Sequence, residues 1–131
     1  MDVIKELIEE HEDILEIITY LESIKNREKN IDFNYLINLT KEFHKIWNEH
    51  EKREETFFKK QKNSLSSIGG LFLEHKELKG YWEVLKGAIK SREKERLINC
   101  IDNDGKLFFE KIKKHMNTEE GLFEIFKIKA K

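Results

Sequence analysis

The chain has 131 residues, of which 39% are charged and 38% hydrophobic, and it carries a formal net charge of −1 with no proline and six glycines. This length fits one domain, residues 1–131, and the composition favours a compact all-α fold with charged outer faces. The balanced charge gives no basic excess for nucleic-acid binding, and no stretch approaches the roughly 18 apolar residues that a membrane span needs.

The single cysteine, Cys100, excludes an internal disulfide, and a reducing compartment is its simplest setting. The N-terminus carries acidic residues where a secretory signal peptide would carry basic residues before an apolar run. We therefore expect a cytoplasmic protein with neither a nucleic-acid partner nor a membrane partner.

Four amphipathic helices are predicted, over residues 2–25, 32–62, 68–90 and 93–120, followed by a short C-terminal extension, 121–131. The polar segments between them are NREKN, after which Asp32 serves as an N-cap, then NSLSS, and then KSREK, where Ser91 is the expected cap. The turn-like sequence DNDG indicates either a kink in the last helix or an alternative break.

Each predicted helix carries apolar residues at helical spacing on one face. This stripe spans residues 4–21 in the first helix and 36–58 in the second. The third stripe includes Ile68 and Leu71, and the fourth includes Phe126. Four such helices with short links predict an antiparallel up-and-down bundle in which the stripes meet in the core.

Six polar side chains fall on these stripes, at positions where the helices would otherwise bury apolar residues. They are His11, His50, Glu54, His75, His115 and Glu119. On two helices a glutamate follows a histidine after four residues, so both side chains project from one face about one turn apart. Because an unpartnered buried carboxylate costs several kcal/mol, a bound cation is the simplest partner for the set.

The spacing of these residues predicts that they share one layer of the bundle. Antiparallel neighbours meet at equal height when their residues are equidistant from the turn between them. The midpoint of His11 and His50 is near residue 30, and that of Glu54 and His75 is near residue 64, both inside polar segments. The midpoint of His75 and His115 is residue 95, just beyond the third segment.

Imidazole and carboxylate donors together suit iron, manganese or zinc. Six donors are too many for a closed structural zinc site, so the set predicts two metal ions, each with two histidines, and both glutamates bridging. An oxo or hydroxo bridge would leave one position on each ion for O2, NO or peroxide. Two alternatives need no metal: a hydrogen-bonded polar layer, or helix phases that place these residues in solvent.

The order His, His-x-x-x-Glu, His, His-x-x-x-Glu across four antiparallel helices resembles the hemerythrin-like, or HHE cation-binding, domain family over essentially the whole chain. The resemblance implies a hemerythrin-like bundle with a non-haem di-iron centre, Fe–O–Fe or hydroxo-bridged. By motif position it implies terminal ligands at His11, His50, His75 and His115, and bridging ligands at Glu54 and Glu119.

The chain departs from the oxygen-carrying members of that family at two places. Those members have a further histidine one turn from the ligand of the third helix, whereas Leu71 and Lys79 stand on either side of His75 here. Their last carboxylate is an aspartate at a spacing of five, whereas Glu119 follows His115 at four. The set of four histidines and two glutamates is more similar to the iron–sulfur-cluster repair and iron-sensing branches, and it would leave both irons open or solvated.

A ferritin-like di-iron bundle is the rival fold, and its signature has an acid three residues before the histidine. None of the four corresponding positions in this chain is acidic. They hold Ile8, Trp47, Phe72 and Ile112.

Other polar residues are interpreted as peripheral. His44 lies off the metal-facing side of its helix. Glu51 and Glu55 are interpreted as parts of solvated faces, and Glu120 is kept as an alternate to Glu119.

Three functions are consistent with this sequence. The first is a di-iron binding protein that binds or senses O2, NO, peroxide or iron itself, with manganese or zinc as alternative metals. The second is a di-iron peroxidase, an NO reductase or an iron donor for cluster repair. The third is a metal-independent helical interaction module, and the sequence leaves weak homodimer formation open.

Overall fold

The computed structural model describes residues 3–27, 30–60 and 66–130. The side chains of 27, 66–69, 71–72 and 126–130 lie outside that description, and with them the predicted stripe members Ile68, Leu71 and Phe126. The described residues contain helices and no strand, so the all-α class is confirmed. In chain order the elements are α1 (Val3–Glu22), η1 (Ile24–Arg27), α2 (Phe33–Lys59), α3 (Ser66–Lys90), α4 (Lys94–Cys100), η2 (Ile101–Gly105) and α5 (Lys106–Ala130).

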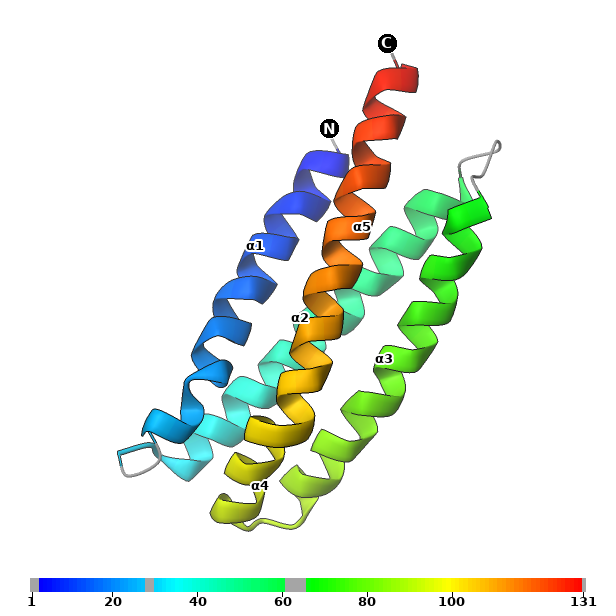
Figure 1. The fold of residues 1–131 in the computed structure, drawn as a ribbon. Helices are drawn as coiled ribbons and strands as arrows, with labels where there is room; N and C mark the ends of the chain where they lie inside the picture. Colours follow the sequence, from blue (N-terminus) through cyan, green and yellow to red (C-terminus); the bar gives the residue numbers. More distant parts are fainter. Residues whose placement is uncertain (1–2, 28–29, 61–65, 131) are drawn as a thin grey trace.

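The long helices lie side by side in one bundle (Figure 1). Helix α1 contacts α2 and α5, and α3 contacts the same two helices, so the four surround a common interior. The chain enters α1 and leaves α5 at the same end of the bundle, while the links from α1 to α2 and from α3 to α4 lie at the other end (Figure 1). Side chains from all four long helices can therefore meet in one layer.

Asp32 is the N-cap of α2, as the sequence predicts. Its carboxylate accepts hydrogen bonds from the backbone N–H groups of Asn34, at 2.8 Å, and Tyr35, at 3.3 Å. These are two of the N–H groups that a helix start leaves without an intrahelical partner. The cap fixes where α2 begins, and hence the height of the ligands that follow on it.

We expect Asp32→Ala to lower the free energy of unfolding by about 1 kcal/mol, because both cap hydrogen bonds are lost. Urea denaturation of the variant and of Asn34→Ala, an exposed substitution two residues further on, measures the effect. Equal stability of the two variants would show that the cap contributes nothing.

The link between α3 and α4 differs from the prediction in its capping. The N-cap of α4 is Glu93, which makes no side-chain cap bond, and not Ser91. The Ser91 hydroxyl instead donates to the carbonyl of Ala88 at 2.6 Å and accepts from the N–H of Glu93, so it closes the end of α3. Between them Arg92 has a positive φ of 57°. That left-handed conformation costs a side chain on the order of 1 kcal/mol and is normally given to glycine at a helix end.

The sequence DNDG is not a break between helices. It forms the π-helical stretch η2, through which the chain remains helical from α4 into α5. The last helix also continues to Ala130 rather than ending at residue 120. Buried Leu122 and Phe123 lie just beyond Gly121 and pack against Leu7 and Phe58, and this apolar contact outweighs the modest helix-breaking tendency of one exposed glycine.

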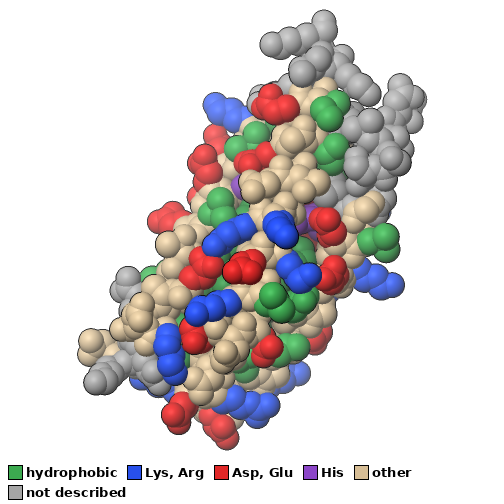
Figure 2. All heavy atoms as spheres, viewed as in Figure 1, with side chains coloured by type: hydrophobic (Ala, Val, Ile, Leu, Met, Phe, Trp, Pro, Cys, Tyr) green, Lys and Arg blue, Asp and Glu red, His purple; other side chains and the backbone are tan. Residues whose placement is uncertain are grey.

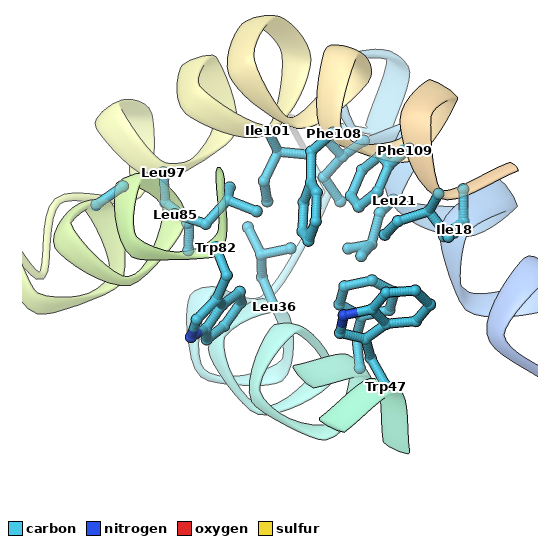
Figure 3. Packing of buried hydrophobic residues seen from close by; sticks show 14 of the residues in the cluster. Ile18, Leu21, Leu36, Trp47, Trp82, Leu85, Leu97, Ile101, Phe108 and Phe109 are labelled. Carbon is cyan, nitrogen blue, oxygen red and sulfur yellow. The ribbon is translucent and has the colours of Figure 1, made fainter. Parts of the chain in front are cut away.

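Two apolar clusters fill the interior. The larger joins residues of every helix and includes Phe43, Phe108 and Phe109, whose rings meet edge to face at centroid distances of 6.0 and 5.7 Å. Figure 3 shows side chains from different helices pointing toward one another in this cluster. The smaller cluster contains Leu7, Phe58, Leu122 and Phe123. On α1, α2 and α5, the predicted metal ligands come between members of the two clusters along the chain.

The outer surface mixes both signs of charge, as the composition suggests. Lysine, arginine and acidic side chains alternate over the face drawn in Figure 2, with apolar atoms between them. None of the described helices combines the length and the apolar character that crossing a bilayer requires.

Candidate metal centre

All six predicted ligands lie in the interior. Each exposes 2% of its surface or less. Only two further buried polar residues occur among the described side chains, Thr40 and Glu51. The Thr40 hydroxyl donates to the Leu36 carbonyl within its own helix. The buried polar layer therefore consists almost entirely of the six residues that the sequence singles out.

The first group consists of His11, His50, Glu54 and Glu119, each of which can place one donor atom within 4.8 Å of the other three. Glu54 Oε2 lies 3.4 Å from His11 Nε2 and 3.2 Å from His50 Nε2. Glu119 Oε1 lies 3.3 Å from His11 Nε2. The two imidazole rings meet edge to face, with centroids 4.6 Å apart. These four side chains could hold one metal ion.

The second group uses the opposite oxygens of the same two carboxylates. Glu54 Oε1 lies 3.6 Å from His75 Nε2. Glu119 Oε2 lies 3.6 Å from His75 Nε2 and 3.2 Å from His115 Nε2. The rings of His75 and His115 again meet edge to face, at 4.6 Å. Each glutamate thus turns one oxygen toward each histidine pair, which is how a carboxylate shared by two ions is placed.

Every one of these histidines also has a carboxylate on its outer nitrogen. His50 Nδ1 lies 2.9 Å from Glu10 Oε1, and His75 Nδ1 lies 3.1 Å from Glu55 Oε1. A carboxylate at Nδ1 orients an imidazole ring and fixes its tautomer, which leaves Nε2 as the lone-pair donor. Both Nε2 atoms face the buried carboxylates.

His115 follows the same rule, whereas His11 has only a longer contact at Nδ1. His115 Nδ1 is hydrogen-bonded to Glu74 Oε2. His11 Nδ1 has the longest of these contacts, since it lies 3.6 Å from Glu120 Oε1. This distance is longer than that of a good hydrogen bond. Glu120, which is 41% exposed, is therefore placed outside the layer, while Glu119, 0% exposed, is inside it.

The four outer carboxylates form a closed ring around the bundle. They belong to Glu10, Glu55, Glu74 and Glu120. Each lies next in sequence to an inner ligand on its own helix, yet contacts a histidine on the neighbouring helix. The contacts run from α1 to α2, from α2 to α3, from α3 to α5 and from α5 back to α1. Adjacent residues on a helix point about 100° apart, so one faces the interior and the next faces the adjacent helix.

The structure corrects the interpretation of Glu51 and Glu55 as parts of solvated faces. Glu55 holds His75, and Glu51 is 4% exposed with one carboxylate oxygen 3.7 Å from His75 Nδ1. Burial raises the pKa of Glu51 to about 7, although nearby His75 and His115 oppose the rise. The sequence signal for the outer acids was present: an acid immediately beside each of four inner ligands.

The electrostatics of the cluster favour charge pairing. Burial lowers the pKa of His11, but contacts with Glu119 and Glu54 outweigh it and raise the pKa to about 10. The same balance raises the pKa of His75 to about 11. Burial also raises the pKa of Glu119, but its contacts with Glu54 and the histidines hold that pKa well below its usual range. Without a cation, the two glutamates would be neutralised by imidazolium groups.

Aromatic rings enclose the layer on both sides. On the side of the large cluster, the Trp47 ring lies 6.2 Å from His50, 6.4 Å from His75 and 6.2 Å from His115, between centroids. On the other side Phe123 stacks on His11 at 6.1 Å. A surface pocket of about 480 Å³ reaches the outer edge of the second group. Its lining is Glu74, Glu77, Leu78, Lys111, Lys114, His115, Asn117 and Thr118.

His44 is not part of the layer. It is half-buried and its ring stacks on that of Trp82. The ring centroids are 4.1 Å apart and the angle between the ring planes is 6°. It belongs to neither four-residue donor group, in keeping with its predicted peripheral position.

The outer carboxylates supply a test of the layer. We expect Glu55→Gln to weaken metal binding by about 10- to 100-fold, because the amide no longer favours the His75 tautomer that presents Nε2. Zinc or manganese titration by calorimetry measures the change. Glu49→Gln removes the same charge from an exposed position of the same helix and should leave the affinity unaltered. Equal affinities for the two variants would reduce Glu55 to a surface charge.

Comparison of the chain with protein-family models, with curated proteins and with solved structures finds no match. The assignment of the centre therefore depends on its own geometry: six buried donors from four helices, arranged as two groups that share both carboxylates and could hold metal.

Proposed function

We propose that the protein is a non-haem di-iron protein, with the hemerythrin-like antiparallel four-helix fold, that binds or senses a small ligand such as O2, NO or peroxide, or iron itself. The observation that supports this most is the position of Glu54 and Glu119. Glu54 directs Oε2 to His11 and His50 and Oε1 to His75. Glu119 directs Oε1 to His11 and Oε2 to His75 and His115.

The residues fit two metal ions because several of their donor atoms are buried without a hydrogen-bond partner. Among the described residues, His50 Nε2, His115 Nε2, Glu54 Oε1 and both oxygens of Glu119 are buried without a hydrogen-bond partner. Orphaned buried acceptors cost several kcal/mol each unless something binds them. Protons shared between the histidines and the glutamates would balance the carboxylate charges but would leave some lone pairs without a partner. Two bound cations would balance the charges and also accept the lone pairs.

The chain's own residues divide the tasks. The four imidazoles would each give an Nε2 donor, the two inner glutamates would bridge, and the outer acids hold the rings in orientation. Imidazole with carboxylate suits iron, and also manganese or zinc. When bound, such a pair of ions supplies open coordination positions for a small ligand. The aromatic residues Trp47 and Phe123 exclude water from the two faces of the layer.

The pocket beside His115 is the proposed route for a small ligand or for the metal itself. Its lining includes Glu74, His115, Lys111 and Lys114. A ligand that enters there meets the second group first. We therefore expect the two metal positions to differ in accessibility, with the His75–His115 side reacting faster.

Metal analysis tests the proposal. Protein produced in iron-supplemented medium should contain about two irons per chain, the number for which the donor set is sufficient, and azide or NO should change its near-ultraviolet spectrum. One zinc, or no metal with the fold intact, would reject the di-iron centre. Turnover of peroxide or NO with a supplied reductant would reassign an iron-loaded protein from a binding role to an enzyme.

A further inference from the structure

A second hollow lies between α2 and the end of α3, and it contains none of the metal-centre residues. It is a surface pocket of about 750 Å³. Its lining is Ile37, Lys41, His44, Trp82, Lys86, Ile89, Lys90 and Arg92. The volume is within the range of pockets that hold small organic ligands. Trp82 and Ile89 are buried and make part of the lining apolar.

The rim of this pocket is strongly basic. Lys41, Lys86, Lys90 and Arg92 are all exposed, and none of them forms an ion pair with any residue that the structure describes. No carboxylate is among the described lining residues. The whole chain has 25 basic and 26 acidic residues. Four cations around one hollow therefore concentrate a positive potential that the chain as a whole lacks.

A flat pair of rings stands inside the basic rim. His44 stacks face to face on Trp82, 4.1 Å between centroids. Burial and the charge of Lys86 lower the pKa of His44 and outweigh the opposing effect of Glu83, the acid that acts on it. An anion in the pocket would reverse this balance, because it favours the imidazolium form, which also attracts the indole face.

The backbone of Arg92 adds an independent observation. This residue holds a left-handed φ of 57° at the end of α3, where glycine would be unstrained. The conformation brings an arginine, a fork-shaped donor suited to phosphate, to the mouth of the pocket. Strained residues of this kind cluster at ligand-binding sites, so the conformation of Arg92 supports a binding role for the pocket.

We propose that this pocket binds a small organic phosphate with a flat ring, its phosphates held by Lys41, Lys86, Lys90 and Arg92 and its ring placed against the His44–Trp82 pair. Lysines bind phosphate as point charges and arginine binds it through paired N–H donors. The limited volume and the two buried apolar residues in the lining favour one small molecule over a nucleic-acid backbone, which would need an extended basic surface. This site does not depend on the metal centre.

Calorimetry with ADP, pyrophosphate, adenosine and an RNA oligonucleotide tests the proposal on the full chain as purified, at low salt. ADP should bind at one site per chain, pyrophosphate should bind more weakly, and adenosine should not bind measurably. The affinity for ADP should fall as salt is raised, and the His44 imidazole resonances should shift toward the protonated form on binding. Equal binding of ADP and adenosine, absence of saturable ADP binding, or binding of an RNA oligonucleotide in place of ADP would each overturn it.

Charge-removing variants locate the site. Lys86→Ala and Arg92→Ala should each weaken ADP binding by about tenfold, the usual loss for one charged phosphate contact. Lys45→Ala removes the same charge from an exposed position next to His44 that does not line the pocket, and it should leave the affinity unaltered. Arg92→Gly should weaken ADP binding equally while raising the Tm. Equal losses in Lys45→Ala and Lys86→Ala would show general charge attraction and no pocket.

Discussion

Replacing either inner glutamate should cost the protein both metal ions, not one. Glu54 and Glu119 each have one oxygen within 3.2–3.6 Å of a histidine in each donor group. Glu119→Ala therefore removes a donor from both groups at once and leaves each with three. We expect iron per chain to fall from about two to well below one, because each remaining set is then short of the donors that a stable site needs.

The histidine variants give the contrasting result. His50 belongs to the first group alone and His115 to the second alone. His50→Ala or His115→Ala should each retain about one ion. His44→Ala is the matched control and should keep both, since its ring stacks on Trp82 outside the layer. Inductively coupled plasma mass spectrometry measures the metal, and circular dichroism checks that each variant is folded. A Glu119→Ala protein with two irons would disprove the bridging role.

The sequence predicted the buried cluster of four histidines and two glutamates because two regularities agree in this chain. Helical periodicity placed six polar residues on apolar stripes, and the turn positions brought His11, His50, His75 and His115 to one height. The burial of all six, each 2% exposed or less, follows from those two patterns. Asp32 was predictable for a similar reason, because an N-cap is a local signal that depends on adjacent residues only.

The features that the sequence missed depend on contacts between helices. Glu10 and Glu74 look like ordinary surface acids, and only the neighbouring helix shows that each holds a histidine. Glu51 was placed in solvent because its helix position, read alone, gives no sign of the α3 surface that covers it. The fourth predicted helix was ended at residue 120, before Leu122 and Phe123, whose packing partners lie on α1 and α2.

The two buried glutamates also determine how the inner layer should respond to pH. In the metal-free protein, His11 has a pKa of about 10 and His75 of about 11, both raised by the buried glutamates against the effect of burial. Their pKa in the unfolded chain is near 6.5. Their stabilising effect is therefore fully present below pH 6.5 and is lost progressively as the pH rises toward 10 and above. Glu119, with a lowered pKa, stabilises above about pH 4.5 and loses that effect in acid.

A bound cation reverses this loss of stability with rising pH. Metal must displace the protons from the imidazoles, so its affinity increases with pH and binding releases protons. We expect the Tm of metal-free protein to fall between pH 6.5 and 8.5, with each kcal/mol lost lowering it by about 4 °C in a chain of this size. The Tm of metal-loaded protein should hold or rise, because tighter binding adds stability by mass action. The difference between the two forms should widen steadily over that range.

Differential scanning calorimetry of both forms across this pH range measures the effect, with zinc or manganese used where iron would precipitate. Titration in two buffers of different ionisation enthalpy counts the protons released. Glu55→Gln offers an internal check, since it disturbs His75 without removing an inner donor. In this variant the Tm difference between the metal-loaded and metal-free forms should be smaller but still present. A Tm difference between the two forms that stays constant with pH, together with no proton release, would contradict this prediction. It would mean that the imidazoles of the metal-free protein are already neutral. The charges of the buried glutamates would then not be balanced by the histidines around them.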